Sequence, residues 1–256
     1  MSGDRADSGD KVVLVTGGSR GIGASVCRHA AALGWKVVVN YSSDGAAAER
    51  VVSDIRAAGG DAMAVQADVG SEADILAMFS FIDSFYGRLD GLVNNAGVVD
   101  KKSRVEDMDL ARLERMFRIN VTGSILCARE AVKRMSTKNG GAGGAIVNVS
   151  SVASVLGGPG EYVDYAAAKG AIDTFTIGLS REVATEGIRV NAVRPGITDT
   201  DIHASGGQPD RVQRLQGLIP MQRAGTPDEI AAAILYLMSD AASYTTGALL
   251  NVTGGR

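Results

Sequence analysis

The chain has 256 residues, 45% of them hydrophobic, and a mean hydropathy of +0.08, which is enough for one large or two small α/β domains. Its formal charge of −3, from 26 basic and 29 acidic side chains, excludes the basic footprint typical of nucleic-acid binding. No apolar run reaches the ~18 residues that span a bilayer, and the polar first ten residues lack the apolar segment of a secretory signal. We therefore expect a cytoplasmic protein whose residues 1–10 form a disordered leader.

Short runs of β-branched residues alternate with longer helical patterns along the chain. We expect strands at residues 11–15, 36–41, 62–66, 91–93, 145–149, 188–193 and 248–252. Helices are expected at residues 24–33, 45–58, 71–86, 109–134, 165–185 and 226–237. This alternation predicts an α/β single-domain Rossmann fold, a doubly wound, mostly parallel seven-stranded sheet with helices on both faces. The domain should cover residues 11–256, with residues 198–222 as a substrate-binding lid.

A glycine-rich turn joins the first strand to the first helix and reads TGGSRGIG from Thr16 to Gly23. Such a turn presents backbone N–H groups and a positive helix end to an anion. Gly17, Gly21 and Gly23 lack the Cβ atoms that would block a pyrophosphate or tight helix packing. The strand before and the helix after this turn therefore predict a dinucleotide site.

The end of the second strand indicates which dinucleotide is bound. An acidic residue usually meets a free ribose 2′-hydroxyl at this place, but here the chain reads Val-Asn-Tyr-Ser-Ser over residues 39–43, and Asp44 comes late. Arg20 can reach the same corner from the glycine-rich turn, and a guanidinium suits a 2′-phosphate. We therefore expect NADP(H) rather than NAD(H).

The segment around Tyr165 carries the candidate chemistry. Tyr165 and Lys169 are four residues apart and share one helical face. A nearby ammonium stabilises a phenolate and should bring the pKa of the phenol, ordinarily near 10, toward working pH. Ser151 ends the neighbouring strand and could hold a substrate oxygen. Asn120, a poor residue for the middle of a helix, suggests a kink with a carbonyl free for water.

These motifs together resemble the short-chain dehydrogenase/reductase family over essentially the whole chain. The match includes the glycine-rich turn, Asp68-Val69, Asn94-Asn95-Ala96-Gly97 and Pro195-Gly196, together with a catalytic tetrad of Asn120, Ser151, Tyr165 and Lys169. The chain is similar to bacterial NADP-dependent enzymes of the 3-oxoacyl-carrier-protein reductase-like and glucose/ribitol dehydrogenase-like branch. The serine-to-tyrosine spacing is one residue longer than the commonest one, which leaves Ser150 as the alternative to Ser151. Thr253 stands where many relatives have aspartate.

The resemblance implies roles for these residues. Tyr165 would be the general acid/base in interconverting a carbonyl and a secondary alcohol, Lys169 would lower its pKa and bind the nicotinamide ribose, Ser151 would polarise the carbonyl, and Asn120 would hold a relay water. A homotetramer built on helices 109–134 and 165–185 is also implied. The expected cofactor contacts are Gly17, Ser19, Arg20, Gly21, Ile22, Gly23, Asn40, Tyr41, Ser42, Asp68, Val69, Asn94, Ala96, Gly97, Tyr165, Lys169, Pro195, Gly196, Thr198 and Thr200.

Other interpretations differ in what they predict. A non-catalytic NADP-binding sensor or scaffold would bind cofactor without turnover, but it has no need for the tyrosine–lysine pair. Epimerases of the extended type usually carry a larger C-terminal substrate domain. Oxidation of a sugar or polyol competes with reduction of a keto compound. His29 and His203 are far apart, so no metal site is expected, and Cys27 and Cys127 are expected to be buried small apolar residues.

Overall fold

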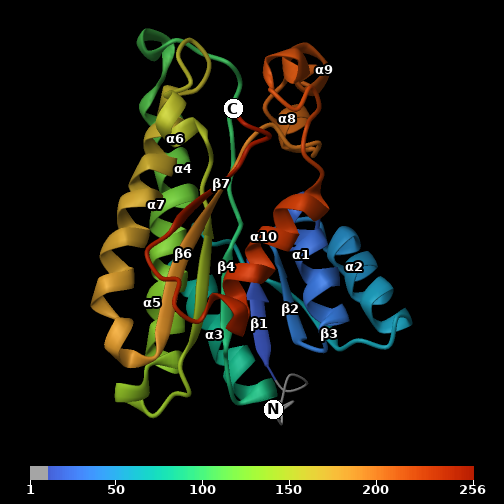
Figure 1. The fold of residues 1–256 in the computed structure, drawn as a ribbon, viewed down its shortest axis with the longest axis vertical. Helices are drawn as coiled ribbons and strands as arrows, with labels where there is room; N and C mark the ends of the chain where they lie inside the picture. The colour runs from blue at the N-terminus through green and yellow to red at the C-terminus, as the bar shows by residue number, and fades with distance from the viewer. Residues whose placement is uncertain (1–10) are drawn as a thin grey trace.

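The sheet is the framework of the molecule, which a computed structural model describes over residues 11–256, with only the backbone described at His203. The leader expected at residues 1–10 lies outside the described residues. Seven strands pair in the order β3-β2-β1-β4-β5-β6-β7, and every pairing is parallel (Figure 1). The prediction of a mostly parallel, doubly wound sheet is confirmed. The strands are β1 (Val12–Val15), β2 (Lys36–Tyr41), β3 (Ala62–Gln66), β4 (Gly91–Asn94), β5 (Gly144–Val149), β6 (Ile188–Pro195) and β7 (Leu249–Val252).

Helices cover both faces of this sheet (Figure 1). Along β1, Val13 and Val15 pack into a core formed with α1, α2 and α10, whereas Val12 and Leu14 pack into a core formed with α3 and α5. Burial on both faces explains why the strand is a continuous apolar run. The helices are α1 (Gly21–Ala32), α2 (Gly45–Ala57), α3 (Glu72–Tyr86), α4 (Leu110–Phe117), α5 (Ser124–Met135), α6 (Ala153–Leu156), α7 (Val163–Glu182), α8 (Ile202–Ser205), α9 (Arg211–Leu215) and α10 (Pro227–Met238).

Side-chain caps fix where several helices begin. Ser71 accepts a hydrogen bond from the backbone N–H of Asp74 at the start of α3. Thr226 and Glu229 form a reciprocal capping box at the start of α10. These bonds satisfy N–H groups that have no partner inside the helix. The predicted helix starts at these two places are therefore confirmed.

The helix expected at residues 109–134 is helical without a break from α4 to α5, but it contains a wider turn. Between α4 and α5 the backbone is π-helical over Arg118–Gly123. This wider turn contains Asn120, whose side chain is fully buried. A π-helical turn admits an extra residue and is common at functional sites, so the irregularity coincides with the residue that the sequence singled out.

The connection order places the candidate site. The chain winds outward from β1 to β3 and then returns through α3 to β4 on the other side of β1. Strand order therefore reverses between β1 and β4, and ligands of such sheets bind beyond the strand ends at this point. The glycine-rich turn follows β1, and residues 95–97 follow β4. The α8–α9 segment lies above this edge (Figure 1).

The two cysteines lie in the core of the protein. Cys27 and Cys127 are buried and unpaired, and burial raises the pKa of the Cys127 thiol to about 12, as expected of apolar packing residues. Within residues 11–256 the structure contains no helix with the length and apolar character of a membrane span.

Candidate active site

The glycine-rich turn is shaped by close backbone contacts. Gly17 and Gly21 have φ angles of 62° and 53°, which glycine adopts without strain. A Cβ on Gly23 would lie 2.3 Å from the carbonyl oxygen of Gly17. The turn therefore needs glycine at these positions to bring the start of α1 against the loop, which leaves helix N–H groups facing the edge of the sheet.

Two asparagines, the buried Asn40 and the partly buried Asn95, hold this turn in place. The Asn40 side chain accepts a hydrogen bond from the N–H of Gly17 at 3.2 Å and donates one to the carbonyl of Ala67 at 3.0 Å. Asn95 donates to the carbonyls of Thr16 and Gly17 at 2.9 and 3.0 Å. Both amides thus fix the loop through its backbone. Asn40 was expected to contact the cofactor, whereas Asn95 belongs to a matched motif but was not among the expected contacts.

A first cavity, here called the loop cavity, opens beside the glycine-rich turn. It measures about 330 Å³ and is lined by Arg20, the end of β2, Asp68, Val69 and residues 95–99. Asp44, the nearest carboxylate after β2, accepts the N–H of Ala47 as the cap of α2. The Arg20 side chain is exposed. The expected contacts that line this cavity are Gly17, Ser19, Arg20, Gly21, Ile22, Asn40, Tyr41, Ser42, Asp68, Val69, Ala96, Gly97 and Thr200.

A second cavity, here called the tyrosine cavity, adjoins the first through shared lining residues that include Ile22, Gly97 and Thr200. It measures about 460 Å³. The expected contacts that line it without lining the loop cavity are Tyr165, Lys169, Pro195, Gly196 and Thr198. Gly23 and Asn94 line neither cavity. Asn94 is instead buried and donates to the Ser124 carbonyl and the Asn148 amide oxygen at 3.0 Å.

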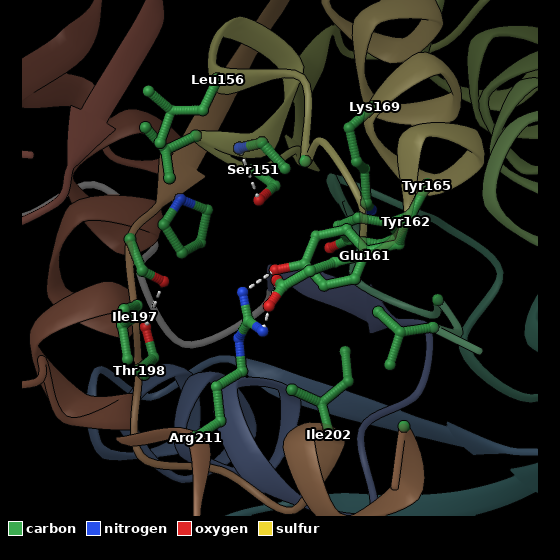
Figure 2. Close-up of a pocket in the computed structure, with 18 of the residues that line it drawn as sticks. Ser151, Leu156, Glu161, Tyr162, Tyr165, Lys169, Ile197, Thr198, Ile202 and Arg211 are labelled. Atoms are coloured by element: carbon green, nitrogen blue, oxygen red, sulfur yellow. Dashed lines mark hydrogen bonds and ion pairs between the residues drawn. The ribbon is translucent and has the colours of Figure 1, made fainter. Parts of the chain in front are cut away.

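Ser151, Tyr165 and Lys169 meet in the tyrosine cavity (Figure 2). The hydroxyls of Ser151 and Tyr165 are hydrogen-bonded to each other, and the backbone N–H of Ala153 donates to the Ser151 hydroxyl at 3.1 Å. Ser150 is different, because its buried hydroxyl donates to the Lys169 carbonyl at 3.3 Å. Of the two serines, Ser151 is the one placed beside the phenol.

Lys169 is held behind the phenol by the backbone. Its ammonium donates to the Val149 carbonyl at 2.7 Å and lies 5.6 Å from the centre of the Tyr165 ring. Burial lowers the pKa of Lys169 to about 8, against a smaller opposing effect of the Asp173 carboxylate. Burial raises the pKa of Tyr165 to about 12, which the hydrogen bond from Ser151 only partly offsets. Burial thus opposes the acidification of the phenol that the sequence predicts.

The π-helical segment places Asn120 against the loop that follows β4. The N–H of Val98 donates to the Asn120 side-chain oxygen at 3.1 Å, and the Asn120 amide donates to the Val98 carbonyl at 3.0 Å. A Cβ on Gly97 would lie 2.7 Å from the Asn120 oxygen and 3.6 Å from the Lys169 ammonium. Asn120 therefore lies beside the lysine, with its side chain bonded to the backbone. Its own carbonyl accepts from the Ser124 hydroxyl at 3.3 Å.

A polar cluster on the far wall of the tyrosine cavity was missed by sequence reasoning. The Arg211 guanidinium, from the lid, donates to Glu161 at 2.6 Å and to the Tyr162 hydroxyl (Figure 2). The rings of Tyr162 and Tyr165 meet edge to face with their centres 5.7 Å apart. Tyr162 has no lysine at the spacing that pairs Tyr165 with Lys169, because Ala166 stands four residues after it. Its cation comes from a residue 49 positions away, which no local pattern indicates.

The buried ammonium of Lys169 leads to a stability prediction. Because its pKa is lower in the folded protein than the ordinary value near 10.5, the folded protein binds this proton less tightly than the unfolded chain. Below pH 8 the cost is on the order of 3 kcal/mol, and it disappears as pH rises from about 8 to about 10.5. We expect Lys169→Met to stabilise the cofactor-free protein at pH 7 by about 1–3 kcal/mol.

Urea unfolding at pH 7 and at pH 10.5 measures this difference. The advantage of Lys169→Met should shrink at the higher pH, because the parent lysine is then neutral in the folded protein and half neutral in the unfolded chain, so that little of the penalty remains. A variant that is no more stable than the parent at pH 7 would show that the ammonium carries no such penalty.

A parallel doubly wound sheet with a glycine-rich turn at its switch point and a Ser–Tyr–Lys group at its C-terminal edge defines a Rossmann-fold oxidoreductase. Residues 17–256 match a family model described as enoyl-(acyl carrier protein) reductase. The chain is 56% identical over 245 residues to an uncharacterized oxidoreductase, YgfF, of Escherichia coli, covering 96% of this chain and 99% of that one. It belongs to the short-chain dehydrogenase/reductase family.

Two further relatives agree with this assignment. A 3-oxoacyl-[acyl-carrier-protein] reductase of Synechocystis is 39% identical over 246 residues, covering 96% of both chains. A short-chain dehydrogenase from Burkholderia cenocepacia, solved in complex with NADP, superposes with a TM-score of 0.88 at 31% identity, covering 97% of this chain and 98% of that one. The family resemblance inferred from the sequence is thereby confirmed.

Proposed function

We propose that the protein is an NADP(H)-dependent oxidoreductase that interconverts a small-molecule carbonyl compound and its secondary alcohol, with Tyr165 as general acid/base. The observation that carries this proposal is the Ser151–Tyr165 hydroxyl pair in front of Lys169, on the wall of the tyrosine cavity. General acid–base catalysis requires such a group within hydrogen-bond reach of the reacting oxygen. A scaffold that only bound the cofactor would not need this arrangement.

The residues present fit NADP(H). The glycine-rich turn offers a backbone cradle that Cβ atoms would fill, at the N-terminus of α1. The loop cavity has the Arg20 cation at its rim, and the nearby Asp44 carboxylate is occupied with capping α2. A cation without a competing carboxylate favours a 2′-phosphate over a free 2′-hydroxyl. The solved NADP complex of a relative supports the same cofactor.

The mechanism in the direction of reduction follows from the three side chains. Bound NADPH supplies a hydride for the carbonyl carbon. Ser151 donates a hydrogen bond that orients and polarises the carbonyl oxygen, and the Tyr165 hydroxyl passes its proton to that oxygen. With its pKa raised, the phenol is neutral at pH 7 and ready to donate. The Lys169 ammonium, held by the Val149 carbonyl, stabilises the phenolate that remains. Alcohol oxidation runs the same proton transfer in reverse.

A substrate panel tests the reaction class. The purified protein should consume NADPH with at least one of a set of ketones and acyl thioesters, or reduce NADP⁺ with a sugar or polyol. Tight NADPH binding without turnover on any member of the panel would favour the sensor or scaffold interpretation. Turnover on sugars alone would place the protein among polyol dehydrogenases.

Arg20 should determine the choice of dinucleotide. We expect Arg20→Ala to raise the Kd for NADPH about tenfold, since hydrogen bonds to charged groups contribute about 1.5–3 kcal/mol, and to leave the Kd for NADH unchanged. Arg28→Ala is a matched control, because Arg28 lies on α1, the helix that follows Arg20, and pairs with Asp54 outside both cavities. Fluorescence titration gives both constants. Equal weakening of NADPH and NADH binding would contradict recognition of the 2′-phosphate.

We also propose that the protein is a cytoplasmic homotetramer. The support is the exposed apolar side chains Leu110, Phe117 and Ile125 on the outer surface of α4 and α5, within the segment that the family resemblance indicates as an interface. Light scattering would then give about four times the chain mass of 26.4 kDa, whereas a mass near that of one chain would contradict it.

A further inference from the structure

The far wall of the tyrosine cavity holds an ion pair that the proposed mechanism does not use. Arg211 on α9 has 8% of its side chain exposed, and Glu161, in the turn before α7, has 22%. Their charged atoms are 2.6 Å apart. In Figure 2 the Arg211 side chain crosses from the lid toward Glu161 and Tyr162, on the side of the cavity opposite Ser151. A substrate whose carbonyl meets Ser151 and Tyr165 therefore extends toward this pair.

The guanidinium of Arg211 is already supplied with acceptors. It donates to the Glu161 carboxylate, to the Gln208 side-chain oxygen at 3.0 Å and to the Tyr162 hydroxyl, and it lies 4.9 Å from the centre of the Tyr162 ring. Gln208 is held in turn by Arg214 at 2.6 Å. A carboxylate or phosphate on a substrate could use this cation only by displacing Glu161, which would leave the partly buried Glu161 carboxylate without its partner.

Two other charged side chains that line the cavity also have polar partners. Asp100 also lines it and pairs with Arg115 at 3.0 Å. Lys169 is committed to the Val149 carbonyl behind Tyr165. Apolar groups, among them Val152, Leu156 and Ile197, face the space between. Arg256 also lines the cavity. Apart from this arginine, the cavity presents an apolar interior and a polar wall whose charged groups are paired or hydrogen-bonded.

We propose that the Glu161–Arg211 pair determines specificity by excluding anionic substrates, so that the enzyme acts on uncharged carbonyl compounds. This proposal rests on the proposed function for the identity of the reacting group. It states that Glu161 occupies the Arg211 guanidinium, so that an anionic group on the substrate cannot pair with it. Removing the Glu161 charge alone should therefore make the cavity accept a carboxylate.

An isosteric pair of probes tests this exclusion. The ligands are 4-oxopentanoate and 4-oxopentanamide, which carry the same ketone and differ in charge. The proteins are the parent, Glu161→Gln, the double variant Glu161→Gln with Arg211→Gln, and Glu106→Gln as a matched control. Glu106 pairs with Arg104 and does not line the cavity. Binding to the NADP⁺-loaded proteins is followed by ligand-observed NMR, and turnover is followed with NADPH.

The parent and the Glu106→Gln control should bind and reduce the amide in preference to the acid. Glu161→Gln should shift the acid-to-amide ratio of binding constants at least tenfold toward the acid, and the double variant should lose this gain because the cation is gone. An unchanged ratio in Glu161→Gln would overturn the proposal. A parent that prefers the acid would also overturn it and point to Arg256. Because binding is measured separately, absence of turnover with both probes bears on the proposed function and leaves the charge-exclusion result interpretable.

Discussion

Replacing Tyr165 by phenylalanine is expected to lower kcat about 10²- to 10⁴-fold, the range that a positioned general acid contributes, while the Kd for NADPH changes little. The substitution removes only the hydroxyl that is hydrogen-bonded to Ser151 and leaves the ring that packs against Tyr162. The effect should therefore appear in the chemical step and spare cofactor binding. Single-turnover kinetics on the NADPH-loaded protein measure it.

Tyr244→Phe provides the control for this prediction. Tyr244 is fully exposed and lines neither cavity, so the same chemical change there should leave kcat unaltered. If Tyr165→Phe kept a kcat within a few fold of the parent, the proton would have to come from another group, and the acid/base assignment would be wrong.

Replacing Gly23 by alanine is expected to weaken NADPH binding about 10- to 100-fold. The added Cβ would lie 2.3 Å from the Gly17 carbonyl oxygen and 2.5 Å from the Asn95 amide nitrogen. The loop must then move away from α1, and overpacking of this kind costs about 1–3 kcal/mol. Fluorescence titration of NADPH measures the loss, and circular dichroism establishes that the variant is folded.

Gly178→Ala is the matched control for this substitution. Gly178 lies within α7, and a Cβ there would meet nothing within 4 Å. We expect unchanged NADPH binding and a gain in stability of up to about 1 kcal/mol, because alanine is the better helix former. A Gly23→Ala protein that bound NADPH as tightly as this control would contradict the assignment of the turn to the cofactor.

The sheet could be predicted from the sequence because its strands are buried on both faces. Runs such as Val12–Val15 are continuous and β-branched, and glycine or asparagine marks where they end. A kink at Asn120 could be predicted from the sequence, but its form, a π-helical turn over Arg118–Gly123, could not. Its cause is a pair of hydrogen bonds to Val98, which is distant along the chain. Long-range backbone contacts of this kind leave no local pattern.

The residues of the site could be predicted more completely than the pKa values of their side chains. Tyr165, Lys169 and Ser151 are brought together as expected. A four-residue spacing does not show, however, how deeply these side chains are buried. Burial is the largest influence on the pKa of Tyr165 and raises it. Asn40 and Asn94 were expected to contact the cofactor, and both are buried; Asn40 still lines the loop cavity, whereas Asn94 lines neither cavity. Polar residues at strand ends can contact a ligand or hold the framework together, and only their packing shows which of the two they do.

Deuterium transfer tests the central claim most directly. NADPH that carries deuterium on the transferable position of the nicotinamide is incubated with the protein and a ketone that it accepts. The alcohol should carry one deuterium on the former carbonyl carbon, which NMR and mass spectrometry measure. In Tyr165→Phe the rate at which this labelled alcohol forms should fall by the factor predicted above for kcat. An alcohol without the label, or label appearing at the same rate in the Tyr165→Phe protein, would contradict direct hydride transfer to a carbonyl that Tyr165 protonates.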